Sequence, residues 1–471
     1  MNNRDEVVGL AEFSLQELKS WNSRIEGICQ REGLDCYNQE FEICSYEEMI
    51  CYEAYIGMPS HYPHWSYGKT YEKIKTLHKY NLTGLPYEMV INSDPCMAYL
   101  MKDNTLLLQI LTMAHVYGHN DFFKNNRLFR DGTNAKYTIE MFKNQANRIR
   151  EYIQDPSIGY DKVEKILNAA HAIKYQTQRI TNERSLGENE KFQRFLDKSN
   201  NVRSSMYPLL EPKEDETKVP AVTRKIPLSP EEDVLKFIIT YGRLEDWEKD
   251  ILSIVRQETM YFIPQIETKI MNEGWASFWH YRILNELSLS QDLHFEFLKR
   301  HNQVIKPLEG QINPYYIGFK IFEDVYKKYG KDKLFEIREI ERDQSFIRRY
   351  LTRELCEETH LFEYIKLSSD YIVSEISDEQ GWKKVRDSLS DISGLGSIPV
   401  IVVDEWQQKD NTLFLRHIYD GRELEFTNAY ETLKHAVDLW GGKVALRTTL
   451  DEKEKTLICD ESRKVTMMNG T

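Results

Sequence analysis

The chain has 471 residues, of which 41% are hydrophobic and 12% aromatic, and it contains 22 glycines and 14 prolines. This length and composition exclude an intrinsically disordered chain and a small disulfide-stapled scaffold, because the chain can bury at least one large core. The 62 lysines and arginines are outnumbered by 75 aspartates and glutamates, and this net charge of −13 disfavours general binding to nucleic acid or to an anionic membrane.

The N-terminal segment carries Arg4, Asp5, Glu6 and Glu12, so it lacks the apolar stretch of a secretory signal peptide. No uncharged apolar run approaches the length of about 18 residues that a membrane span needs. The seven cysteines are odd in number and include no Cys-x-x-Cys pair, which predicts free thiols. We therefore expect a cytoplasmic protein without a membrane span.

Helical periodicity dominates the first part of the chain. It runs through residues 6–56 and again through 137–180. Between them, residues 87–100 are rich in β-branched and aromatic side chains and are interrupted by Pro95, which suits an edge strand or an extended segment. Asn104 is a plausible N-cap for the helix that follows, which is apolar almost all round and is therefore expected to be buried in a large core.

The pattern changes twice in the second part of the chain. Prolines and acidic residues accumulate over residues 182–231, which predicts a long surface connection. Helices then resume, including an apolar one over 271–287, and after about residue 360 short alternating strands surround a helix over 428–439. We predict a predominantly helical α+β protein with a core domain at 1–360 and a small α+β domain at 361–471.

Two histidines in the first apolar helix are the strongest candidates for metal ligands. At about 100° per residue, His115 and His119 lie on one helical face one turn apart, so both imidazoles can reach one metal ion. Spacing alone is weak evidence, but two imidazoles in an otherwise apolar helix need partners to offset their desolvation. Histidines satisfied by other core side chains, without a metal, are the alternative.

The second apolar helix supplies a candidate third ligand. Glu273 and His280 are seven residues apart and share one helical face. A carboxylate in such an aromatic run is costly unless it is paired or binds a metal. Together with His115 and His119, Glu273 makes the ligand set of a zincin-like metallohydrolase core, with one position open on a divalent metal, best zinc. His280 is better placed to contact a ligand histidine or the substrate than to bind the metal, and it is a candidate catalytic residue that handles protons or orients the substrate.

The expected metallohydrolase motif is incomplete. In the pattern HExxH the residue after the first histidine is the general-base glutamate, and here it is Val116. Asp121 is the nearest carboxylate in sequence and the candidate to replace it, although hydrogen bonding near the helix end explains Asp121 equally well. Gly118 lowers helix stability by roughly 1 kcal/mol relative to alanine, so it indicates close approach of a ligand or of another helix.

Several neighbouring residues are candidates for binding substrate. His61, His64 and Trp65 lie in an aromatic segment that follows a proline-broken loop, and loops of this kind often line sites, although a structural aromatic turn explains them equally well. Tyr117, between the two histidines, and Asn120, directly after the second, are expected to contact substrate. No nucleotide-binding or serine-nucleophile fingerprint appears in the sequence.

Four long segments resemble the SpoVR family, stage V sporulation protein R. They are HYPHWSYGKTYE (61–72), NTLLLQILTMAHVYGHNDFFKNN (104–126), TKIMNEGWASFWHYRIL (268–284) and NPYYIGFKIFED (313–324). The resemblance implies a cytoplasmic protein of sporulating bacteria that is needed to form the spore cortex, a peptidoglycan layer. It does not bring an established reaction.

Three hypotheses follow from these observations. The first is a metal-dependent enzyme acting on an amide bond, with a peptidoglycan peptide or its precursor as substrate. The second is a non-catalytic regulator or scaffold, with a degenerate metallohydrolase fold and partners among the cortex-synthesis proteins, and Val116 favours this reading. The third is a metal-free core in which Glu273 pairs with a histidine.

Overall fold

The computed structural model describes residues 13–79, 88–179, 190, 193, 226–307, 312–361, 363–367, 370–375 and 381–469. The chain forms two compact units: residues 1–150 with 261–397, and residues 151–260 with 398–471. The chain passes from one unit to the other within two helices, α6 and α10, and again after Ser397. Most of the predicted connection at 182–231 lies outside the described residues.

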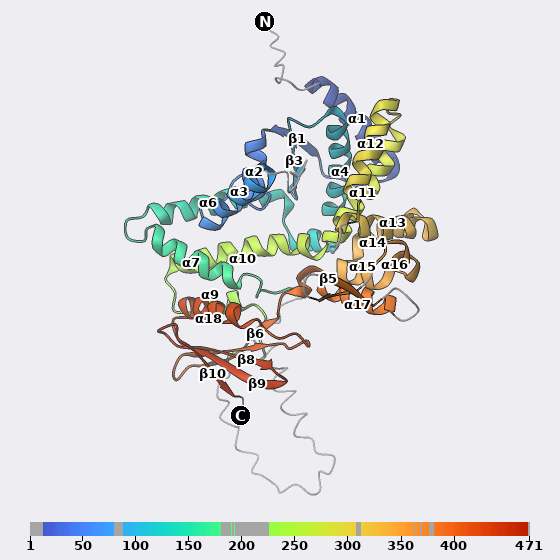
Figure 1. The fold of residues 1–471 in the computed structure, drawn as a ribbon. Coiled ribbons are helices and arrows are strands. Elements are labelled where there is room, and N and C mark those ends of the chain that lie inside the picture. Colours follow the sequence, from blue (N-terminus) through green and yellow to red (C-terminus); the bar gives the residue numbers. More distant parts are fainter. Residues whose placement is uncertain are drawn as a thin grey trace. The chain divides into compact units, whose positions relative to one another are not determined.

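The first unit is mainly helical (Figure 1). Its N-terminal half contains α1 (Leu15–Glu32), β1 (Gln39–Cys44), α2 (Tyr46–Ala54), α3 (Trp65–Lys79), β2 (Glu88–Ile91), β3 (Cys96–Met101), α4 (Leu106–Asn125), α5 (Arg127–Gly132) and most of α6 (Thr138–Gln154). Its C-terminal half contains the end of α10 (Asp246–Glu267), then α11 (Lys269–Glu286), α12 (Gln291–Val304), α13 (Pro314–Tyr329), α14 (Lys331–Ile340), α15 (Asp343–Tyr350), α16 (Arg353–Glu358), β4 (Glu363–Leu367), β5 (Asp370–Glu375) and α17 (Gly381–Ile392).

Helix α4 is the centre of this unit. All of its residues from Gln109 to Phe123 are buried, as its continuous apolar pattern predicts. Helix α11 packs directly against α4 and against α13, and it buries Trp275 and Trp279 completely. The two apolar helices predicted from the sequence are therefore confirmed. The helix N-cap is Thr105, whose hydroxyl accepts a hydrogen bond from Leu108 N, and not Asn104.

A small sheet beside α4 departs from the prediction. Its strand order is β1-β3-β2, with β1 parallel and β2 antiparallel to β3. The predicted edge strand at 87–100 is in fact two strands, because the chain turns at residues 92–95 and folds back. Of the two, β2 lies at the edge and β3 at the centre. Strand β1 falls within the segment 6–56, which was expected to be helical.

The second unit is a five-stranded sheet with helices. It contains α7 (Tyr160–Ile173), α9 (Val234–Tyr241), β6 (Ile401–Gln407), β7 (Thr412–His417), α18 (Phe426–Trp440), β8 (Val444–Leu450), β9 (Lys453–Cys459) and β10 (Val465–Asn469). The strand order is β10-β9-β8-β7-β6. Only β7 and β8 are parallel, and α18 makes the connection between them, ending at Gly441 in the left-handed conformation. The predicted helix and most of the predicted strands of the C-terminal α+β domain are confirmed in this unit, but the strand at 370–375, β5, lies in the first unit.

The division between the units differs from the expected boundary near residue 360. Residues 381–392 form α17, which packs on α15 in the first unit, so the core extends beyond that boundary. Conversely, α7 packs on α18, so the second unit recruits a helix from far upstream in the sequence. Such packing between helices does not change the amino-acid composition near residue 360, so the sequence did not show where the units divide.

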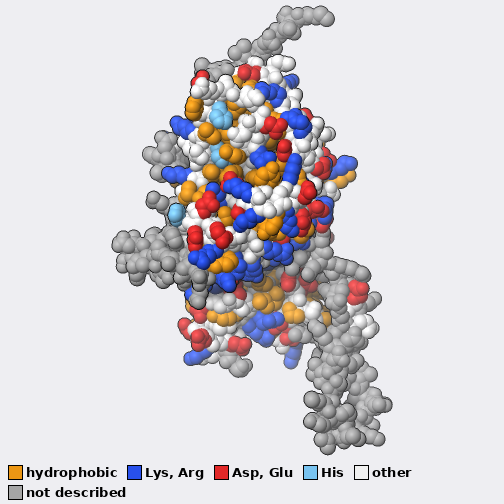
Figure 2. Space-filling model, turned by 90° about the vertical axis from the view of Figure 1, so that its right-hand side faces the viewer, with side chains coloured by type: hydrophobic (Ala, Val, Ile, Leu, Met, Phe, Trp, Pro, Cys, Tyr) orange, Lys and Arg blue, Asp and Glu red, His pale blue; other side chains and the backbone are white. Residues whose placement is uncertain are grey.

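The described surface in Figure 2 carries charges of both signs, and the cysteines form no disulfides. On the face in Figure 2, lysine and arginine side chains are interspersed with aspartate and glutamate over the described residues. Within the described residues, no helix has the length and apolar character needed to cross a membrane. All seven cysteines are free.

Candidate metal centre

Four side chains from α4, α11 and β2 meet at one buried point. The Nε2 atoms of His115 and His119 lie 3.8 and 3.5 Å from the same carboxylate atom, Glu273 Oε2. Glu88 reaches this point from β2, and its Oε1 lies 3.4 Å from His115 Nε2. Glu88, His115 and His119 each offer one possible ligand atom, and these three atoms lie within 4.8 Å of one another. The structure thus brings together the three predicted ligands and adds Glu88.

Close contact between helices brings Glu273 to the histidines. A Cβ atom on Gly118 of α4 would lie 2.6 Å from Ala276 Cα of α11, so only glycine permits this approach. On the next helix contact, a Cβ on Gly274 would lie 2.4 Å from the Gly318 backbone of α13. Gly118 therefore marks the approach of another helix, one of the two readings that the sequence allowed.

The start of α11 is fixed by a carboxylate from another helix. Its N-cap residue, Thr268, makes no capping hydrogen bond with its side chain. Instead, Asp343 accepts hydrogen bonds from Ile270 N (2.8 Å) and Met271 N (2.9 Å), which otherwise lack intrahelical partners. This contact fixes the first turn of α11 and hence the position of Glu273 one turn later.

Three atoms at the centre lack the hydrogen bonds that buried polar atoms normally make. Glu88 Oε2, His115 Nε2 and Glu273 Oε2 are buried and have no hydrogen-bond partner within the described residues. The separations of 3.4 to 3.8 Å are too long for good hydrogen bonds. An unpaired buried polar atom is costly, so a cluster of three needs an explanation. A cation held between the Nε2 atoms of His115 and His119 and Glu273 Oε2 would give two of these atoms, His115 Nε2 and Glu273 Oε2, a partner.

The environment shifts the pKa values of His119, Glu273 and Glu88. Burial, and next the neighbouring His115, lower the pKa of the His119 imidazole to about 4. Burial opposes ionisation of Glu273, but His115 and His119 outweigh it and hold the pKa of this carboxyl below its ordinary value. Neutral imidazole and ionised carboxylate are the forms that bind metals. Burial raises the pKa of the Glu88 carboxyl to about 7, although His115 acts in the opposite direction.

Each candidate ligand is held by a further side chain. His119 Nδ1 lies 2.8 Å from Asn272 Oδ1, and His115 Nδ1 lies 2.8 Å from His280 Nδ1. The Tyr315 side chain hydrogen-bonds the Glu273 carboxylate. Such contacts orient ligating side chains in metal sites. His280 thus contacts a candidate ligand and not the common point itself.

Asp121 lies in a different network, on the opposite face of α4. Its carboxylate accepts hydrogen bonds from Asp35 N (2.7 Å), Trp275 Nε1 (2.9 Å) and Arg338 Nη1 (2.7 Å). Burial raises the pKa of this carboxyl to about 6, against the effect of Arg338. This position does not support the expected role of Asp121 as general base, because its carboxylate hydrogen-bonds side chains of α11 and α14 and so links these helices to α4.

This network predicts a large effect on stability. We expect Arg338→Leu to lower the free energy of unfolding by about 3 to 5 kcal/mol, because it leaves the Asp121 charge buried and unpaired. Arg348→Leu, which breaks an exposed pair with Asp391, is the control and should cost about 1 kcal/mol or less. Urea denaturation of both variants measures the difference, and equal losses would contradict the structural role of Asp121.

Tyr117 and Asn120 are also used by the protein's own structure. The Tyr117 hydroxyl donates a hydrogen bond to Asn22 Oδ1 at 3.1 Å. The Asn120 amide accepts a hydrogen bond from Tyr37 N (2.7 Å) and donates to Tyr37 O (3.0 Å) and to Gln39 Oε1 (2.9 Å). Both side chains hold N-terminal segments on α4, which does not favour the expected contact with substrate.

His61 and His64 lie in an aromatic segment directly before α3, and Trp65 is the first residue of that helix. The His61 ring is buried, accepts a hydrogen bond from Tyr62 N at 3.0 Å and lies 4.6 Å from the Tyr67 ring, centroid to centroid. His64 Nδ1 lies 2.6 Å from Ser66 Oγ, and Trp65 is half exposed. These contacts match the structural reading of the segment, and substrate binding by these residues stays a prediction.

Sequence reasoning missed Glu88, Asn272 and Tyr315. Glu88 is one of 75 acidic residues and lies in a strand of four residues, so no spacing links it to the histidines. Only the packing of β2 beside α4 identifies it. For Asn272, the only signal in the sequence is its position directly before Glu273.

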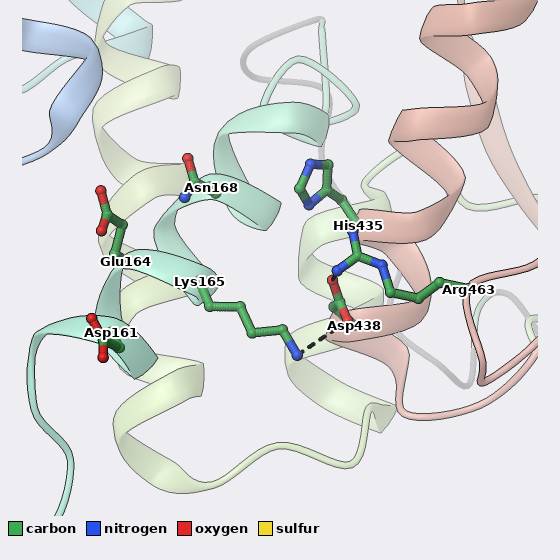
Figure 3. Close-up of a pocket in the computed structure, with 7 residues that line it drawn as sticks. All are labelled: Asp161, Glu164, Lys165, Asn168, His435, Asp438 and Arg463. Atoms are coloured by element: carbon green, nitrogen blue, oxygen red, sulfur yellow. Dashed lines mark ion pairs between the residues drawn. The ribbon is translucent and has the colours of Figure 1, made fainter.

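A pocket of about 290 Å³ lies in the second unit, between α7 and α18 (Figure 3). Asp438 pairs there with Lys165 at 3.2 Å and with Arg463 at 3.2 Å, and Figure 3 shows Lys165 extending across to it. The remaining lining residues are Asp161, Glu164, Asn168 and His435. The Lys165–Asp438 pair connects α7 and α18, and the Arg463–Asp438 pair connects α18 to the segment between β9 and β10.

Comparison with known proteins identifies the family. Residues 12–398 match the model of the family described as SpoVR like protein, and residues 399–451 match the SpoVR-like C-terminal domain. The chain is 34% identical over 475 residues to a protein of Escherichia coli strain K12 described as uncharacterized protein YcgB, and the match covers 92% of each chain. No solved structure matches the chain. The chain therefore belongs to the SpoVR family.

Proposed function

We propose that this chain is a metal-dependent enzyme whose zincin-like centre holds one divalent cation, best zinc, through His115, His119 and Glu273. Imidazole nitrogen and carboxylate oxygen are ligands that zinc prefers, and three protein ligands leave one of its four positions open. The most direct support is that His115 Nε2 and Glu273 Oε2, which lie 3.8 Å apart, are buried and have no hydrogen-bond partner among the described residues. A divalent metal there would polarise an amide carbonyl and activate water.

Glu88 would serve as the general base in this proposal. The motif HExxH supplies that base from the residue after the first histidine, where this chain has Val116. The Glu88 carboxylate lies 3.4 Å from His115 Nε2, so strand β2 offers a carboxylate at the centre that α4 lacks. Its pKa of about 7 suits a group that exchanges protons at neutral pH.

The substrate class rests on the resemblance to a family needed for the spore cortex. We propose an amide bond in a peptidoglycan stem peptide or its precursor, acted on in the cytoplasm. The alternative is a regulator of cortex synthesis with a non-catalytic metal site, with the proteins of cortex synthesis as its partners. Val116 favours this alternative, because the usual catalytic residue is absent from the helix.

Cleavage of synthetic stem peptides separates the two functions. The zinc-loaded protein is incubated with stem peptides and the products are followed by mass spectrometry. We expect fragments from the wild type and a loss of at least about 100-fold in rate in Glu88→Gln, as removal of general-base catalysis implies. Zinc-loaded wild type that leaves every peptide and precursor intact would contradict the enzyme and favour the regulator.

A further inference from the structure

We infer that His280 and His301 are positioning residues that fix the ring of His115 for metal binding. The inference rests on the proposed metal centre and adds a third helix, α12, to it. His115 Nδ1 lies 2.8 Å from His280 Nδ1, and His280 Nε2 lies 2.8 Å from His301 Nδ1. All three residues are at most 3% exposed. They form one continuous chain of hydrogen bonds through α4, α11 and α12.

The chain of hydrogen bonds runs in a single direction, from His115 to His301, once His115 Nε2 binds a metal. That nitrogen must then present its lone pair, so the ring hydrogen of neutral His115 is on Nδ1. His115 donates this hydrogen to His280 Nδ1, so the hydrogen of His280 is on Nε2 and is donated to His301 Nδ1. His301 is the final acceptor of the chain. With the metal on His115 Nε2, both ring nitrogens of His115 and of His280 and the Nδ1 of His301 then have a partner, as buried polar groups require.

The His301 ring is itself held in place by aromatic side chains. Its centroid lies 4.7 Å from the ring of Tyr281 and 5.2 Å from that of Phe319. Helix α12 is also attached at the start of α4, where the Thr105 hydroxyl donates a hydrogen bond to Glu296 Oε1 at 2.9 Å. The acceptor at the end of the chain is therefore fixed relative to the helix that carries His115 and His119.

The test separates hydrogen bonding by His301 from its packing. His301→Phe keeps an aromatic ring but removes the acceptor, whereas His301→Gln keeps an acceptor oxygen. His294→Phe is the matched control, because His294 lies on the same helix outside the chain of hydrogen bonds. Cobalt(II) is the probe, since both its affinity and its visible absorption spectrum report the ligand geometry. Circular dichroism verifies that each variant is folded.

We expect His301→Phe to lower the cobalt affinity by about 10- to 100-fold and to shift the visible spectrum, as loss of a residue that orients a ligand does elsewhere. His301→Gln and His294→Phe should stay close to the wild type. Wild-type affinity and spectrum in His301→Phe would overturn the inference alone, as would an equal loss in His301→Gln. A wild type that binds no cobalt would overturn the proposed metal centre and the inference together.

Discussion

Replacement of Gly274 by valine is expected to prevent the first unit from folding. A Cβ atom at this position would lie 2.4 Å from the Gly318 backbone of α13, where no side-chain rotation can relieve the overlap. Helices α11 and α13 would have to separate, which would open the core around Trp275 and Trp279. We expect loss of soluble protein or loss of the cooperative thermal transition. Circular dichroism during heating measures that transition.

Gly68→Ala is the control for this prediction. Gly68 lies in α3, and a Cβ there meets no atom within 4 Å. Alanine should stabilise α3 by about 0.5 to 1 kcal/mol, because it has the higher helix propensity. A Gly274→Val protein that melts at the wild-type temperature would show that α11 and α13 do not pack as closely as the structure has them.

Replacement of Glu273 by glutamine is expected to lower zinc affinity by at least about 100-fold, more than loss of an orienting residue does. Glu273 Oε2 lies 3.8 and 3.5 Å from the Nε2 atoms of the two candidate histidine ligands, and an amide binds zinc far more weakly than a carboxylate does. Zinc at 100 times its dissociation constant should stabilise the wild type by about 2.7 kcal/mol. Thermal melts with and without a chelator should show this gain in the wild type and not in the variant.

Glu286→Gln is the matched control on the same helix. Glu286 is exposed and pairs with Arg31, so its replacement should leave the effect of the chelator unchanged. If the chelator lowers the melting temperature of Glu273→Gln as much as that of the wild type, Glu273 is not a ligand.

The helices of the site could be predicted because their pattern is local. An uninterrupted apolar run identifies α4, and the same reasoning identifies α11, since a helix without a polar face must be buried. The spacing of His115 and His119 follows from the helical repeat alone. The contact of these histidines with Glu273 was predicted from residue chemistry. In the structure, the close approach of α4 and α11 at Gly118 and Ala276 makes this contact possible.

The remaining partners depend on tertiary packing and left no such trace. Glu88 reaches the centre from a strand of four residues, and His301 joins it through His280 from a separate helix. Asp121 shows the reverse error: its sequence position beside His119 suggested a shared role, yet a separation of two residues turns a side chain by about 200° around the helix. Proximity in sequence is therefore a poor guide to shared function within a helix.

The metal content of the untagged protein tests the proposed centre most directly. Wild type, Glu273→Gln and Glu286→Gln are purified without a chelator or a histidine tag and analysed by elemental mass spectrometry. We expect about one equivalent of zinc or another divalent metal in the wild type and in Glu286→Gln, and its loss in Glu273→Gln, as one ligand set of three predicts. Wild-type protein that is folded but free of metal, and stays so after incubation with zinc, would contradict the metal centre.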